Sequence, residues 1–236
     1  MQVTGNNPLA SKRLSIRVST DGFSFYTPQG QRDFAVKDGE SVTEMLKEAL
    51  RKHSLLTSDY DEVCLLSDYP ATRVPLDEFR SEEAQSLYKL TFGEDSAKGL
   101  TILYEVLPAL EVVEIYAVDA DVTTVVREQF PEASIHGFYG QTLLNALTED
   151  RKQGDEGRRL HVSLCGHDLF ICSFIDGRLQ FANTYPVRAV SERQYFILYV
   201  WSQLELNQLT DNCLLYGEDA ELQTMLGKYI RHITCV

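Results

Sequence analysis

The chain has 236 residues and a formal net charge of −13, with 22 Lys and Arg against 35 Asp and Glu. This balance, and the lack of any basic cluster beyond a short pair or triplet, argue against nucleic acid and anionic membranes as partners. No stretch approaches the ~18 uninterrupted apolar residues of a membrane span, and the first residues lack the apolar segment of a signal peptide. We therefore expect a cytoplasmic protein without membrane insertion.

The charge is unevenly distributed along the chain. Residues 1–157 hold 15 Lys and Arg against 27 Asp and Glu, whereas residues 158–236 hold 7 against 8. We interpret the acidic first part as a contribution to solubility. The five cysteines form no C-x-x-C pair, and four lie in apolar strand-like segments, which favours reduced, buried thiols.

Residues 1–12 are expected to be a disordered lead-in. Apolar periodicity and capping signals then predict strands at 14–18, 23–26 and 33–36, a helix after a Ser41–Glu44 capping box, a strand at 63–66 and a helix at 81–90. The next expected elements are strands at 101–107 and 112–118, a helix from Asp119 or Asp121 to about 130, a strand at 133–136 and a helix at 141–147. N-capping explains the two aspartates better than a pair of acid–base carboxylates does.

Residues 149–158 are charged, contain glycine and lack apolar side chains, which predicts a linker. The elements expected after it are strands at 160–164, 169–174 and 179–185, a helix from a Ser191–Gln194 capping box to about 209, a strand at 213–216, a helix at 219–226 and a strand at 229–236. This β-β-β-α-β-α-β order predicts a mixed sheet covered by helices.

The first half of the chain repeats the beginning of this order. Aligning Arg13 with Arg159 places the apolar residues of 14–18 on those of 160–164 and brings the following turns together. The shared order of elements favours an internal duplication. Two unrelated hairpins are the alternative.

A duplicated unit of this kind resembles the actin-like ATPase superfamily, which includes actin, hsp70-type chaperones and sugar kinases. Residues 175–187, IDGRLQFANTYPV, are similar to the second-domain meander of the pilus-assembly and cell-division actin homologues. Residues 113–147 are similar to their inserted subdomain and closing helix. As a whole, the sequence looks most like an uncharacterised bacterial family, a domain of unknown function with this fold.

The resemblance implies an α/β protein built from two ribonuclease H-like domains. They are expected at about 13–150 and 158–236, with a small inserted α+β subdomain near 99–137. The resemblance also implies a place for ATP between two hairpins, each of which opens with an Asp-x-Gly turn. In such a turn the glycine lets backbone N–H groups approach the phosphates, and the aspartate orients Mg²⁺ or the attacking water.

Neither Asp-x-Gly turn is present in this sequence. The first position holds Arg17-Val18-Ser19 and the second holds Ser163-Leu164-Cys165. The Gly-Gly pair of the adenosine-binding region is reduced to one glycine, Gly217. The degenerate cleft positions are therefore Arg17, Ser19, Ser163, Cys165 and Gly217. A guanidinium cannot coordinate Mg²⁺, so we expect ATP·Mg to be neither bound tightly nor hydrolysed.

Two other features could form a site. Arg17 lies inside an apolar strand and could bind an anion or a carboxylate, although strand alternation favours a side chain that points to solvent. The Cys165-Gly166-His167 segment has only His161 and Cys172 nearby in sequence, which is too few for a metal site. A plain turn with a buried cysteine is the better interpretation. We expect no catalytic residue, no metal and no cofactor.

The sequence thus favours a non-catalytic, actin-like-fold protein that acts by binding a protein partner, which it does not identify. The alternative is a divergent phosphotransferase or ATPase that binds nucleotide in the interdomain cleft by another route. A third hypothesis is an anion or small-molecule sensor with Arg17 as a contact. The sequence leaves the oligomeric state open.

Overall fold

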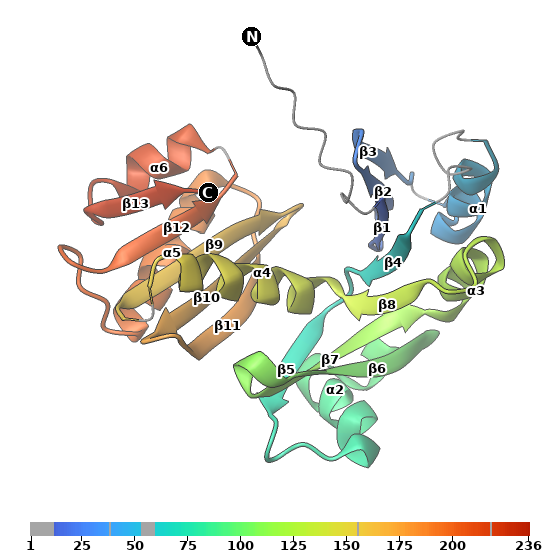
Figure 1. The fold of residues 1–236 in the computed structure, drawn as a ribbon, viewed down its shortest axis with the longest axis horizontal. Helices are drawn as coiled ribbons and strands as arrows, with labels where there is room; N and C mark the ends of the chain where they lie inside the picture. Colours follow the sequence, from blue (N-terminus) through green and yellow to red (C-terminus); the bar gives the residue numbers. More distant parts are fainter. Residues whose placement is uncertain (1–11, 38, 53–59, 155, 218) are drawn as a thin grey trace, which may run out of the picture. The chain divides into compact units, whose positions relative to one another are not determined.

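The computed structural model describes residues 12–37, 39–52, 60–154, 156–217 and 219–236. It is an α/β structure with two five-stranded sheets and one three-stranded sheet, each packed against helices (Figure 1). The chain divides into two compact units, Met1–Gln141 and Thr142–Val236. No helix in the described part of the chain is both long and apolar enough to cross a membrane.

The first unit contains a five-stranded sheet of order β3-β2-β1-β4-β8. Its strands are β1 (Arg13–Val18), β2 (Gly22–Thr27), β3 (Gly30–Ala35), β4 (Glu62–Ser67) and β8 (Ser134–Gly137). The pairs β1–β2 and β2–β3 are antiparallel, whereas β1–β4 and β4–β8 are parallel. The alternate residues Leu14, Ile16 and Val18 of β1 are buried, as expected for a strand covered on one face by helices.

Helices α1 (Val42–Lys52) and α3 (Ala120–Gln129) complete the core of this sheet. The carboxylate of Asp119 caps α3, because its Oδ1 accepts hydrogen bonds from the backbone N–H groups of Asp121 and Val122 at 2.8 and 3.1 Å. The capping role predicted for Asp119 is confirmed.

The first unit also contains a three-stranded antiparallel sheet of order β5-β7-β6. Its elements are β5 (Ala71–Pro75), the 3₁₀ helix η2 (Ser81–Glu83), α2 (Ala84–Phe92), the 3₁₀ helix η3 (Glu94–Ala97), β6 (Leu100–Leu107), the 3₁₀ helix η4 (Pro108–Leu110) and β7 (Val112–Asp119). Strand β5 was not predicted, because it is a short, half-buried edge strand without a clear apolar alternation. The inserted subdomain was expected near 99–137, but its three-stranded sheet also contains β5, which precedes that segment. Strand β8 lies within the segment and belongs to the five-stranded sheet.

An ion pair with a fully buried carboxylate joins two strands of the three-stranded sheet. Glu114 on β7 accepts a hydrogen bond from Arg73 on β5 at 2.6 Å. Burial raises the pKa of Glu114, and the positive charge of Arg73 opposes this rise. The backbone passes close to this carboxylate at Gly137 and Gly140, where an added Cβ would collide with Glu114 Oε2. These glycines let the start of α4 (Phe138–Lys152) approach the pair.

The second unit contains a five-stranded sheet of order β11-β10-β9-β12-β13. Its elements are β9 (Arg158–Cys165), β10 (Asp168–Ile175), β11 (Arg178–Pro186), α5 (Val190–Gln203), β12 (Asn212–Tyr216), α6 (Ala220–Leu226) and β13 (His232–Cys235). The pairs β9–β10 and β10–β11 are antiparallel, whereas β9–β12 and β12–β13 are parallel. This is the topology of the first five-stranded sheet, so the expected duplication is confirmed.

Local predictions are wrong at two places, and helix α5 also ends at Gln203 and not at about residue 209. Residues 149–158 are not a linker at their start, because α4 continues to Lys152 and the carboxylate of Asp150 is fully buried. Helix α5 does not begin with a Ser191–Gln194 capping box. Instead, the carboxylate of Glu192 accepts the backbone N–H groups of Arg188 and Ala189. The buried Asp150 carboxylate accepts donors from neighbouring side chains, whereas the exposed Glu192 carboxylate satisfies backbone donors that precede the helix.

We predict that Gly140→Ala destabilises the protein, although alanine is the better helix former by about 1 kcal/mol. The new methyl group must displace the buried Glu114 carboxylate, and overpacking of this kind costs about 1–3 kcal/mol. The measurement is the free energy of urea unfolding. The control is Asn145→Ala, which changes an exposed residue of the same helix and should be neutral or stabilising. A Gly140→Ala protein as stable as wild type would contradict the close approach.

Candidate functional site

The first degenerate position lies at the carboxyl end of β1, beside the parallel strand β4. Arg17 on β1 donates from Nε and Nη2 to Oδ2 of Asp68 at 2.9 and 2.5 Å. Asp68 directly follows β4, and its backbone N–H donates to the carbonyl of Val18 at 2.8 Å. Because the two parallel strands end together, the ladder itself places the guanidinium beside the carboxylate.

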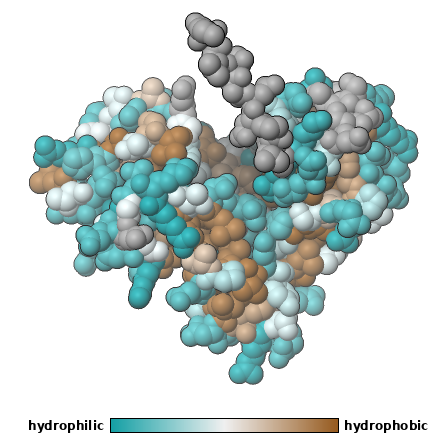
Figure 2. All heavy atoms as spheres, in the orientation of Figure 1, coloured by the Kyte–Doolittle hydropathy of each residue, from teal (hydrophilic) through white to brown (hydrophobic). Residues whose placement is uncertain are grey.

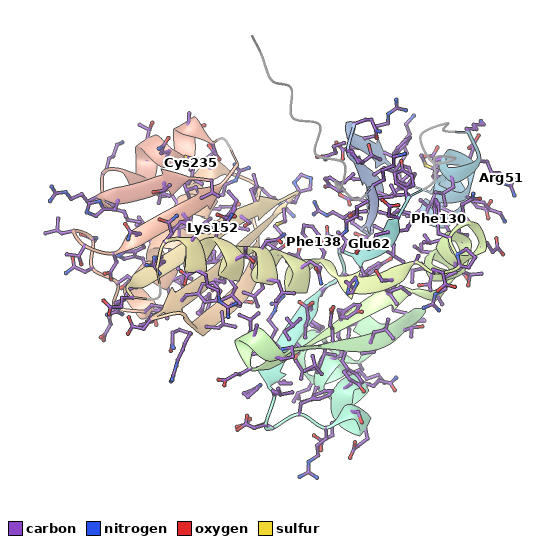
Figure 3. The ribbon with its side chains drawn as sticks, viewed as in Figure 1. Arg51, Glu62, Phe130, Phe138, Lys152 and Cys235 are labelled. Atoms are coloured by element: carbon purple, nitrogen blue, oxygen red, sulfur yellow. The ribbon has the colours of Figure 1, made fainter. Side chains whose placement is uncertain are left out.

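The Arg17 side chain is also held from another direction. Its guanidinium carbon lies 3.9 Å from the ring centroid of Phe138, the first residue of α4, which Figure 3 labels. The side chains of Arg17 and Asp68 are only 17% and 9% exposed. The expectation that Arg17 points to solvent is therefore wrong, and the carboxylate-binding alternative is the one observed. Charge pairing and the cation–π contact together stabilise this packed arginine.

Ser19 closes the turn between β1 and β2. Its backbone N–H donates to the carbonyl of Gly22 at 2.9 Å, and its Oγ donates to Oδ1 of Asp21 at 2.6 Å. Gly22 needs to be glycine because an added Cβ would collide with the carbonyl oxygen of Phe34 on the neighbouring strand. The Asp21-Gly22 pair thus serves the hairpin.

The second degenerate position lies at the carboxyl end of β9. Ser163 and Cys165 are both buried, and the turn that follows contains Gly166 with a φ of 67°. The Cys165 thiol lies 3.9 Å from the carbonyl of Ser163. Among the described residues, no group of three or more His, Cys, Asp or Glu side chains is placed to hold a metal ion. The geometry is that of a tight turn with a buried cysteine.

Gly217 lies beside these residues because β12 runs parallel to β9, with Tyr216 opposite Ser163. Its φ of 94° is a backbone dihedral angle that residues other than glycine rarely adopt. The structure thus brings the five sequence-predicted positions together in two groups. One group is Arg17 with Ser19 in the first unit. The other is Ser163, Cys165 and Gly217 in the second unit.

A buried polar network next to the second group was not predicted. His161 on β9 lies 2.8 Å from the Tyr216 hydroxyl through Nδ1 and 3.1 Å from Oδ1 of Asp150 through Nε2. Arg159 Nη1 donates to the same Asp150 oxygen at 3.3 Å. Burial raises the pKa of Tyr216, with a smaller contribution from nearby negative charge. The only signal for this network in the sequence was Asp150, an acidic residue in the segment that we interpreted as a linker.

The network fixes the end of α4 to the sheet of the second unit. Asp150, Arg159 and His161 are each at most 4% exposed. Such groups are expensive to bury, and removing one partner leaves the others unpaired. The network therefore makes the position of this helix depend on a single carboxylate.

These features and the repeated sheet topology define a protein with the actin-like ATPase fold. The family model described as "Protein of unknown function (DUF3822)" matches residues 5–233, and the chain belongs to this family. A crystal structure of a Bacteroides thetaiotaomicron protein with actin-like ATPase fold and unknown function is similar, with a TM-score of 0.80 and 28% identity over 96% of this chain and 91% of that one.

A structure of the PilM–PilN type IV pilus biogenesis complex is similar in fold, with a TM-score of 0.59 and 9% identity over 95% of this chain and 88% of that one. A comparison with curated proteins finds no match.

We predict that Asp150→Ala lowers the free energy of unfolding by about 3–5 kcal/mol, because it leaves Arg159 and His161 buried without their shared acceptor. Trp201, the single tryptophan, is buried in the core of the same unit and reports the unfolding by fluorescence. The control is the neighbouring Glu149→Ala, which removes a surface pair with Lys152 and should cost less than about 1 kcal/mol. Equal effects of the two substitutions would contradict the role of the network.

Proposed function

We propose that this chain is a non-catalytic member of the actin-like ATPase fold and that it acts by binding another protein. The observation that carries the proposal is the Arg17–Asp68 pair. It occupies the position where the resemblance implies a metal-orienting aspartate and a glycine that phosphates can approach closely. With an internal ion pair at this position, the chain has neither the aspartate that would orient Mg²⁺ nor the glycine that would let phosphates approach.

Asp68 does not restore a magnesium site in this arrangement. Its Oδ2 is bound by both Nε and Nη2 of Arg17, so a cation on this carboxylate would lie beside a positive charge that repels it. Nor does Arg17 offer a strong phosphate site, because its charge is already offset by the carboxylate and its plane is covered by Phe138. Binding of the metal ion and binding of the phosphates of ATP·Mg are therefore both disfavoured at these two residues.

The second unit supports the same conclusion. Ser163 and Cys165, in place of the other Asp-x-Gly turn, supply a hydroxyl and a thiol, neither of which is a carboxylate ligand for Mg²⁺. The protein-binding part of the proposal draws support from PilM, which has a similar fold and is seen in a complex with PilN. At 9% identity this likeness concerns the fold.

We expect the melting temperature to stay unchanged in the presence of ATP, ADP or GTP with Mg²⁺. A ligand that binds only the folded state at one hundred times its Kd adds about 2.7 kcal/mol of stability, a shift that a thermal-denaturation assay detects easily. An hsp70-type chaperone under the same conditions is the positive control. A saturable rise in melting temperature with any of these nucleotides would favour a divergent phosphotransferase or ATPase instead.

Binding to a protein is tested separately by affinity capture from native lysate. We expect the folded chain to recover at least one partner reproducibly. The Asp150→Ala variant should not recover this partner when the capture is done above the temperature at which the variant unfolds. Repeated capture without any specific partner would contradict the protein-binding role.

A further inference from the structure

Strand β6 is an open edge of the three-stranded sheet. Within the described residues it pairs on one side only, with β7, over all eight of its residues. Two of its side chains, Tyr104 and Val106, are large, apolar and exposed at 45% and 42%. An exposed edge strand presents a row of backbone donors and acceptors that can pair with another strand.

The other edge strands that the structure describes are protected in the ways that natural sheets use. Strands β8 and β13 have four residues each, and β5 has five and ends in Pro75. Strand β3 carries Arg32 and Asp33, and the pairing of β11 with β10 contains a register shift. Strand β6 is long, continuous and free of proline, and its single charged side chain, Glu105, is bound to His136 at 3.0 Å.

The two faces beside this edge differ in chemistry. On one face, Tyr104 contacts the ring of Phe79 with centroids 4.9 Å apart, and Ile102 packs with the apolar cluster under α2. On the other face, Glu105 lies beside His136, between Leu103, which packs against the core of the five-stranded sheet, and the buried Leu107. A strand added to β6 would therefore place alternate side chains next to apolar rings and next to a carboxylate.

The surroundings of the edge are acidic and partly apolar. Residues 69–119 contain ten Asp and Glu against four Lys and Arg. Of the ten exposed large hydrophobic side chains in the described part of the chain, four belong to this segment, namely Leu76, Leu90, Tyr104 and Val106. Figure 2 shows hydrophobic residues at the surface in the lower part of the view, where the three-stranded sheet lies in Figure 1.

We propose that β6 is the docking site for an extended segment of a partner protein, which adds to the sheet as a strand and alternates basic with apolar side chains. This inference rests on the proposed function and names the kind of partner. Backbone hydrogen bonds to the open edge supply affinity, and the two faces of β6 supply specificity. The acidic surroundings raise the rate of encounter with a basic segment.

Charge separates this occupant from a second copy of the chain. Edge-to-edge pairing of two copies would bring two acidic segments together, each with six more acidic than basic residues. Like charges across such an interface are repulsive, whereas a basic segment is attracted.

The test uses a labelled synthetic peptide of eight residues in which valine and lysine alternate, with binding followed by fluorescence anisotropy. We expect this peptide to bind the wild-type chain and to bind Val106→Lys at least tenfold more weakly. The control Leu90→Lys makes the same kind of change at an 83% exposed residue that belongs to α2 and not to the edge strand, and should leave the affinity within twofold. A peptide of the same sequence with alternate N-methylated residues should fail to bind, because it cannot pair with the edge.

Three results would overturn the β6 site. These are no binding of the valine–lysine peptide, equal weakening by both lysine variants, and a dimer in size-exclusion chromatography that Val106→Lys dissociates. The last result would assign the edge to a second copy. If affinity capture still recovers a partner while the peptide fails, the protein-binding function stands and this site alone is wrong.

Discussion

The ion pair between Arg17 and Asp68 is the constraint on which the account of this protein depends. It arises from the fold itself, because the parallel ladder of β1 and β4 brings the ends of both strands together. Each partner is mostly withdrawn from water, so either charge alone would be costly there. Phe138, the first residue of α4, covers the guanidinium, so the pair also contacts the start of this helix.

The second unit shows the same topology with different chemistry. The carboxyl end of β9 carries a buried serine and cysteine, and the polar residues next to it are drawn into the Asp150–His161–Tyr216 network. The two halves share the backbone arrangement of the actin-like ATPase fold, while these polar side chains are engaged with one another inside each unit. A shared fold does not fix a shared function.

Sequence patterns predicted the architecture well because strand alternation, turn residues and element order are local signals that the duplication repeats. Two of the departures occur where a charged residue has its partner in another helix or strand. Asp150 looked like part of a solvated linker, and Arg17 looked solvent-facing. The partners that bury them, Arg159 with His161 and Asp68, are set by strand pairing and helix packing. Strand β5 was missed for a related reason, since a short edge strand shows little periodicity of its own.

The central claim is that these residues no longer bind a metal-bound nucleotide, and isothermal titration of the chain with ATP·Mg tests it most directly. The account predicts no saturable heat beyond dilution at millimolar ATP. A binding curve with micromolar affinity and one site per chain would contradict it.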